Sequence, residues 1–180
     1  MNRPTRAAAT MVAAVILVGS VSVPASADDF GGCYGPDGAE GCVPDNFEHT
    51  FCFESNMTSA FIYHSRNAMV YLDAYSSYYD NEQSSCSAAT DVVFRQSSGI
   101  PAYADYQCLD WNFWGRCEQA RIRLDAADLT TSATRRHSAC HEIGHSGGLR
   151  HGGTVDCMRT GLRSESNYSS HHIGHLNNRN

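Results

Sequence analysis

The segment HEIGHSGGLRH, residues 141–151, constrains the fold more than any other part of this sequence. On an α-helix His141 and His145 are about one turn apart and lie on the same face, so both imidazoles can reach one metal ion. His151 would lie roughly 15 Å from His141 along the axis if the helix continued that far. The helix must therefore end after His145, and the chain must bring His151 back to the ion.

Two adjacent glycines supply the helix end that this geometry requires. Gly147 and above all Gly148 can terminate the helix, because glycine readily adopts the left-handed conformation found just beyond helix ends. Three neutral imidazoles with an open fourth position are typical of catalytic zinc, whereas a structural site has a fourth protein ligand. Glu142 follows the first ligand and can reach a metal-bound water. The sequence thus predicts one zinc ion with three ligands, His141, His145 and His151.

Two alternatives to a catalytic zinc site remain open for this segment. The histidines could be surface residues in a polar, glycine-rich tail, or they could hold zinc without catalysing a reaction. Glu142 distinguishes the zinc-binding alternatives, because it is not needed to hold the ion but is the group that hydrolysis requires.

Residues 1–27 have the pattern of a secretory signal peptide. Arg3 and Arg6 precede an apolar run over residues 7–23, and the small residues at 25–27 fit a cleavage site. A membrane-spanning anchor is the alternative, but the run is at the short limit and no second apolar stretch of about 20 residues follows. We therefore expect an exported, extracellular protein with one domain.

The charge of the chain limits its partners. The formal net charge is −6, and removing a leader that contains two arginines and no acid changes it to −8. No basic patch suggests nucleic acid. We expect no nucleic-acid or membrane partner; the oligomeric state is open, and a monomer is assumed.

All eight cysteines follow the predicted signal peptide. An even number in an exported chain indicates up to four disulfides, although eight cysteines allow 105 pairings and spacing alone selects none. No CxxC pair is present, which argues against a cysteine zinc ribbon or a thioredoxin-type redox site. The pairs that we expect are Cys33–Cys42, Cys52–Cys86, Cys108–Cys117 and Cys140–Cys157.

The apolar pattern predicts two longer helices. Apolar residues recur at intervals of three and four from Asn56 or Thr58 to about Ser77, which indicates an amphipathic helix. A second helix is expected to start at Thr131 or Ser132, because either residue can cap it, and to contain the first two histidine ligands.

The remaining segments predict a short sheet and a last helix. Three strands are expected between the longer helices, at residues 90–96, 101–111 and 117–126, the last with Ala120, Ile122 and Leu124 on one face. A short helix is expected from residue 169 or 170 to 176. Residues 28–50 are rich in Gly, Pro, Asp and Cys and predict a disulfide-closed loop. We therefore divide the mature chain into an N-terminal extension, 28–55, and a domain, 56–180.

The segment HEIGHSGGLRH resembles the HExxHxxGxxH zinc signature of the metzincin metalloproteases at every defined position. These enzymes also have a turn whose methionine lies beneath the metal, and Met158 in DCMRTG matches it. The chain is snapalysin-like in size, similar to the small secreted bacterial metzincins. It departs from them in having His151 where they have aspartate, and in lacking the usual Pro or Tyr shortly after the methionine.

The resemblance implies a fold and an activity. The implied fold is an α+β zincin-type domain with a small twisted mixed sheet, a long helix, an active-site helix, a Met-turn and a C-terminal helix. The implied activity is that of a zinc endopeptidase acting on protein or peptide substrates, with Glu142 as general base. The fold would also bring Cys140 close to Cys157. Calcium is possible, but no loop has the regular oxygen-ligand spacing of a calcium site.

Several residues outside the signature could also bear on function. His137 cannot share an ion with His145, since about 12 Å of helix separates them, so a packing or surface role is expected. His171 and His175 have ligand spacing but no third partner. Tyr168 could donate a hydrogen bond to an oxyanion, as a tyrosine does in some metzincins, although packing is the expected role. For three aromatic residues we favour core packing over a substrate rim: Trp111, Phe113 and Trp114.

Three classes of function follow from these observations. The favoured one is a secreted zinc endopeptidase. An exported zinc-binding module or degenerate protease that binds a partner is the alternative, and a disulfide-stapled structural protein is the third. The intact Glu142 opposes the second class, and the intact histidine triad opposes the third.

Overall fold

The structure is a computed structural model that describes residues 42–178. The predicted signal peptide lies outside these residues, and so does Cys33 of the predicted Cys33–Cys42 pair. The elements, in chain order, are β1 (Glu48–Phe53), α1 (Ser59–Tyr75), β2 (Tyr79–Glu82), β3 (Val92–Ser97), β4 (Ala104–Trp111), β5 (Cys117–Asp125), α2 (Ser132–Ser146) and α3 (Ser170–Asn177).

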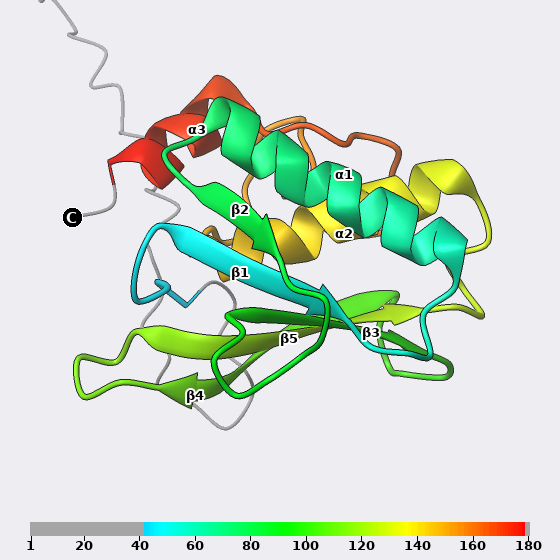
Figure 1. The fold of residues 1–180 in the computed structure, drawn as a ribbon. Coiled ribbons are helices and arrows are strands. Elements are labelled where there is room, and N and C mark those ends of the chain that lie inside the picture. The colour runs from blue at the N-terminus through cyan, green and yellow to red at the C-terminus, as the bar shows by residue number, and fades with distance from the viewer. Residues whose placement is uncertain (1–41, 179–180) are drawn as a thin grey trace, which may run out of the picture.

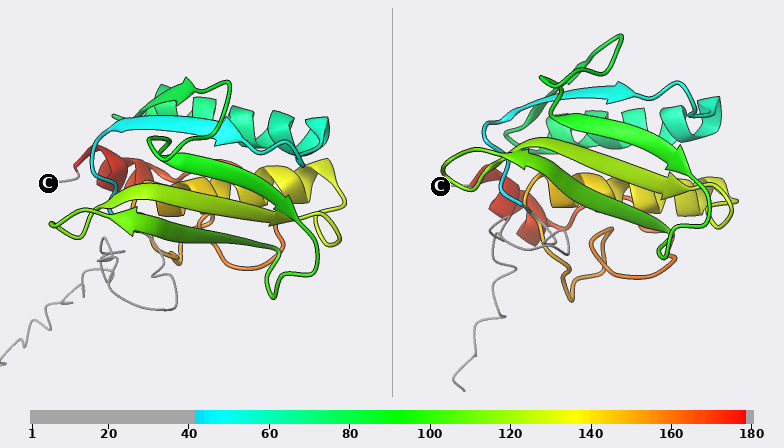
Figure 2. Two further views of the ribbon diagram at one scale, coloured as in Figure 1. Left: turned by 60° about the horizontal axis from the view of Figure 1, so that its bottom comes forward. Right: turned by 90° about the horizontal axis from the view of Figure 1, so that it is seen from below.

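The strands form one mixed sheet in the order β2-β1-β3-β5-β4. The first four strands in this order are parallel to one another, and β4 pairs antiparallel with β5 at the edge. Figure 1 shows α1 and α2 side by side over one face of this sheet. The views in Figure 2 show no helix of the described residues on the opposite face. The predicted α+β class with a small mixed sheet is confirmed.

The main core lies between the sheet and the two long helices. Side chains from both layers are fully buried there, among them Phe51, Phe94, Ile122, Leu72 and Ile143, at 0–1% exposure. This burial fixes α2 over β5 and β4, so the histidine-bearing helix has a rigid support.

Side-chain caps account for the starts of two helices. The hydroxyl of Thr131 accepts a hydrogen bond from the backbone N–H of Thr134 (3.2 Å) in a capping box at the start of α2. The hydroxyl of Ser169 accepts one from the N–H of His172 (3.3 Å) at the start of α3. The helix α1 begins after Thr58 without a side-chain cap. All three predicted helices are therefore confirmed within one to three residues at their ends.

The strand predictions are partly correct. The strands β3, β4 and β5 are confirmed, and Ala120, Ile122 and Leu124 are buried on one face as expected. The sequence pattern does not predict β1 or β2. The segment that forms β1 falls within the predicted N-terminal extension, yet β1 lies inside the sheet between β2 and β3. Its buried residues are His49, Phe51 and Cys52, a set that includes a polar side chain and two adjacent positions, so its sequence does not show a regular polar–apolar alternation.

Three of the expected disulfides are present: Cys52–Cys86, Cys108–Cys117 and Cys140–Cys157.

The prediction of core packing for the aromatic residues of the β4–β5 hairpin is wrong. Trp111, Phe113 and Trp114 are 51%, 91% and 78% exposed. Trp111 ends the edge strand β4, and the other two residues lie in the turn to β5, so these rings do not enter the main core. No helix among the described residues is long and apolar enough to span a bilayer.

Candidate metal centre

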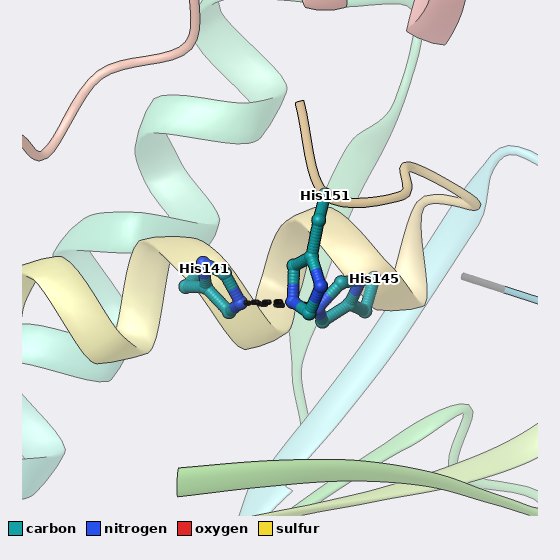
Figure 3. A group of neighbouring side chains, drawn as sticks. All are labelled: His141, His145 and His151. Atoms are coloured by element: carbon teal, nitrogen blue, oxygen red, sulfur yellow. Dashed lines mark hydrogen bonds between the residues drawn. The ribbon is translucent and has the colours of Figure 1, made fainter. Parts of the chain in front are cut away.

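The structure brings the three predicted histidine ligands together. His141 and His145 lie in α2, and His151 comes from the segment that follows it (Figure 3). The Nε2 atom of His141 is 2.9 Å from that of His151 and 3.1 Å from that of His145, and the remaining Nε2–Nε2 distance is 3.2 Å. Nitrogen ligands at about 2.0–2.1 Å around a tetrahedral zinc ion lie roughly 3.3–3.4 Å apart. The triad thus has nearly the dimensions of a zinc site.

The end of α2 turns the chain back toward His141 and His145. The helix ends at Ser146, and Gly148 has a φ angle of 92°, in the left-handed region. The N–H of Gly148 donates to the carbonyl of His145 (3.0 Å), and the N–H of Leu149 donates to that of Gly144 (2.9 Å). These two bonds form a Schellman motif. The reversal allows His151 to meet ligands that lie on the helix.

Backbone carbonyls fix the orientation of two of the imidazoles. The Nδ1 atom of His141 lies 2.7 Å from the carbonyl oxygen of Cys157, and that of His145 lies 2.8 Å from that of Leu149. A carbonyl only accepts hydrogen bonds, so each Nδ1 bears the proton and donates it. Each neutral ring then presents a lone pair at Nε2, and these lone pairs face each other. A cation between them satisfies this arrangement, so the residues present fit a zinc ion.

Burial keeps these imidazoles in the neutral form that binds metal. Desolvation lowers the pKa of His141 to about 4, although the hydrogen bond to Cys157 acts in the opposite direction. Desolvation, followed by the nearby His141, lowers the pKa of His145 well below its usual value. Both rings are therefore unprotonated near neutral pH, and no proton has to leave them when a metal binds.

A pocket of about 470 Å³ opens over the triad. Glu142 lines this pocket together with all three histidines, and it is 5% exposed. The opposite wall comes from the first half of β4, including Tyr106, whose ring centroid lies 6.2 Å from that of His145. A predicted metal site and a predicted acid–base residue thus share one cavity.

Met158 packs against the helix that bears the ligands. It is fully buried, and a Cβ atom added at Gly144, between the two helical ligands, would lie only 2.2 Å from its sulfur. Gly144 therefore permits the close approach of Met158. Sequence reasoning did not single out this glycine, although a glycine inside a helix between two ligands is itself a signal of close packing.

Asp156 is a second residue that sequence reasoning missed. Its carboxylate accepts hydrogen bonds from the N–H groups of Met158 (2.9 Å) and Ser169 (2.9 Å), and it pairs with the buried ring of His172. Burial by itself would raise the pKa of Asp156, but these hydrogen bonds outweigh it and lower the pKa well below its usual range. The carboxylate thus joins the methionine turn to α3.

The other histidines and Tyr168 lie outside the triad. His137 is buried, its Nδ1 donates to the carbonyl of Glu165 (2.7 Å), and it lines the pocket without joining the metal ligands. His171 and His175 have ring centroids 4.5 Å apart, but the triad is the only group of three metal-ligating side chains within residues 42–178. The hydroxyl of Tyr168 donates to the carbonyl of Cys140 (2.8 Å) within the core, so the structure favours its packing role.

Comparison with known proteins gives similarity in structure only. No protein-family model and no curated protein matches the chain. Among solved structures, myroilysin matches with a TM-score of 0.42 and 15% identity, over 58% of this chain and 48% of its own. High choriolytic enzyme 1, a hatching-enzyme zinc protease from the medaka fish Oryzias latipes, matches with a TM-score of 0.43 and 11% identity, over 61% and 50%.

A third match is archaemetzincin from Archaeoglobus fulgidus, solved in complex with malonate. Its TM-score is 0.46 at 14% identity, and the match covers 71% of this chain and 98% of that protein. The chain therefore spans about half the length of the first two proteins and nearly all of the third.

Proposed function

We propose that the mature chain is a secreted zinc-dependent endopeptidase. The observation that supports this most strongly is the convergence of three imidazole Nε2 atoms within 3.2 Å of one another, in a pocket that also contains Glu142. A purely structural zinc site is usually closed by a fourth protein ligand. Here the three-histidine group lines an open cavity large enough for a substrate segment.

The chain's own residues have distinct roles in the proposed hydrolysis. His141, His145 and His151 would hold the zinc ion. Zinc, when bound, supplies a Lewis acid that polarises a peptide carbonyl and lowers the pKa of water toward about 7. Glu142 takes the proton from the attacking water and returns it to the departing amine.

The location that we propose is extracellular. The disulfides Cys52–Cys86, Cys108–Cys117 and Cys140–Cys157 support this location, because such bonds persist in oxidising surroundings. The substrate class that we propose is protein or peptide.

Cleavage of an unfolded protein by the purified mature chain tests this proposal, with zinc content measured in every sample. We expect Glu142→Gln to hold one zinc ion yet lose at least about 100-fold in rate, the scale of general acid–base catalysis. Glu118→Gln, at an exposed position of β5, is the matched control and should cleave like the wild type. Full cleavage by Glu142→Gln would refute the assigned role. If the wild type and Glu142→Gln both hold zinc and neither cleaves the substrate, a binding module would be favoured instead.

A further inference from the structure

The bridge between Cys140 and Cys157 joins two segments of the metal centre. Cys140 precedes the ligand His141 in α2, and Cys157 precedes Met158 in the turn below it. The two sulfurs are bonded, the Cα atoms are 5.9 Å apart, and both residues are at most 1% exposed. The bridge is thus part of the packed interior directly behind the metal ligands.

Cys157 also supplies the carbonyl that orients His141. The distance from that oxygen to Nδ1 of His141 is 2.7 Å, and the two residues are sixteen apart in sequence. This hydrogen bond sets both the ring orientation and the tautomer, so it determines where the Nε2 lone pair points. The position of the Cys157 carbonyl relative to α2 therefore controls one metal ligand.

The two helical ligands differ in how their acceptor carbonyls are held. The acceptor for His145 is Leu149, four residues away, whose own N–H is bonded to Gly144 in the turn that ends α2. Local backbone geometry is enough to fix it. The acceptor for His141 belongs to a long connection without helix or strand, from residue 147 to 169, so it depends on tertiary contacts. One of these tertiary contacts is covalent, namely the Cys140–Cys157 disulfide.

Other contacts hold the same segment without joining residue 157 to α2. The N–H of Met158, in the same peptide group as this carbonyl, donates to the carboxylate of Asp156 (2.9 Å). The N–H of Cys157 donates to the carbonyl of Asn167 (3.0 Å), which lies in the same irregular connection. The Tyr168 hydroxyl bonds the carbonyl of Cys140 (2.8 Å). These contacts stabilise the connection, but only the disulfide joins residue 157 covalently to the helix position next to His141.

From this geometry we propose that the Cys140–Cys157 disulfide is a positioning element for His141 and thereby sets the zinc affinity of the site. The inference rests on the proposed zinc site. It assigns the bridge a role beyond stabilising the fold: it holds the Cys157 carbonyl against the imidazole. Loss of an orienting partner of a ligand typically weakens metal binding 10–100-fold.

The test compares two variants that each lack one disulfide. Cys140→Ala/Cys157→Ala removes the bridge at the metal centre. Cys52→Ala/Cys86→Ala removes one that joins β1 to the β2–β3 connection and has no residue lining the pocket. Zinc dissociation constants are measured by competition with a chromophoric chelator, well below the unfolding temperatures of all the proteins. We expect the first variant to bind zinc about 10–100-fold more weakly and the second to match the wild type within about twofold.

A second measurement separates positioning from general destabilisation. In the zinc-loaded protein, the Nδ1–H protons of His141 and His145 give separate NMR signals. The bridge variant should lose or shift the signal of His141 and retain that of His145, whose acceptor is local. If the alanine pair does not fold, Cys140→Val/Cys157→Ala restores part of the buried volume and is used instead.

The outcomes distinguish the two proposals. Unchanged zinc affinity in the bridge variant, or an equal loss in both disulfide variants, would overturn the positioning role and leave the zinc site standing. Failure of the wild type itself to bind zinc would overturn the proposed metal centre and the positioning role together.

Discussion

Replacing Gly144 by alanine should destabilise the protein, although the same change stabilises most helices. In a helix interior, alanine is favoured over glycine by about 1 kcal/mol. Here the added Cβ would lie 2.2 Å from the sulfur of Met158, 3.0 Å from its Cε and 3.1 Å from a ring carbon of Tyr168. Met158 is fully buried, so its displacement disturbs the packing against α2. Overpacking of this kind typically costs about 1–3 kcal/mol.

Because a 2.2 Å contact is severe, we take the upper part of this range, about 2–3 kcal/mol, and subtract the helix gain of about 1 kcal/mol. The net destabilisation that we expect is therefore about 1–2 kcal/mol, or a fall of roughly 3–8 °C in unfolding temperature for a domain of this size. Gly174, in α3, is the matched control, because no atom lies within 4 Å of an added Cβ there. Gly174→Ala should raise the unfolding temperature by up to about 4 °C. Thermal unfolding of the metal-free proteins, followed by circular dichroism, measures both. A Gly144→Ala protein as stable as the wild type would refute the packing argument.

Four further substitutions test other parts of the structure. Asp156→Asn should destabilise the fold by about 2–4 kcal/mol in chemical denaturation, because it removes a buried carboxylate that accepts several hydrogen bonds; a loss below about 0.5 kcal/mol would contradict this role. Desolvation and a hydrogen bond with Asp73 raise the pKa of Asp80 to about 6. A carboxyl group whose pKa is raised on folding destabilises the folded state above that raised pKa, and not below its pKa in the unfolded chain. The free energy of unfolding of Asp80→Asn, relative to that of the wild type, should therefore increase by about 1 kcal/mol, after allowance for partial exposure, as the pH rises from 4 to 7. A gain that is equal at both pH values would exclude this titration. Phe113→Ser and Trp114→Ser should shift the unfolding temperature by less than about 2 °C, since exposed side chains contribute little; a large fall would show that the rings pack after all.

The histidine segment could be predicted in detail because its constraints are local. Helical spacing fixes the relation of His141 to His145, and the left-handed conformation at Gly148 depends on glycine alone. The helix starts near Thr58, Thr131 and Ser169 could also be predicted from the sequence, because helix-start signals depend on residues within a few positions of the start.

The missed features depend on contacts between distant parts of the chain. The strand β2 has the polar sequence YDNE and forms by pairing with β1, so no apolar pattern marks it. The exposed rings at Phe113 and Trp114 resemble core residues in composition, and only the position of the hairpin tip shows otherwise. Gly144 and Asp156 act through Met158, whose place beneath α2 is a tertiary property. The site chemistry was therefore more predictable than the packing that supports it.

X-ray absorption spectroscopy of the zinc-loaded protein tests the central claim most directly. Three imidazole ligands predict three nitrogen scatterers at about 2.0–2.1 Å, completed by an oxygen from water, with one zinc ion per chain. His151→Ala should remove one of these nitrogens. A sulfur scatterer near 2.3 Å, an unchanged spectrum for His151→Ala, or a protein that binds no zinc would contradict the assignment of His141, His145 and His151 as the metal ligands.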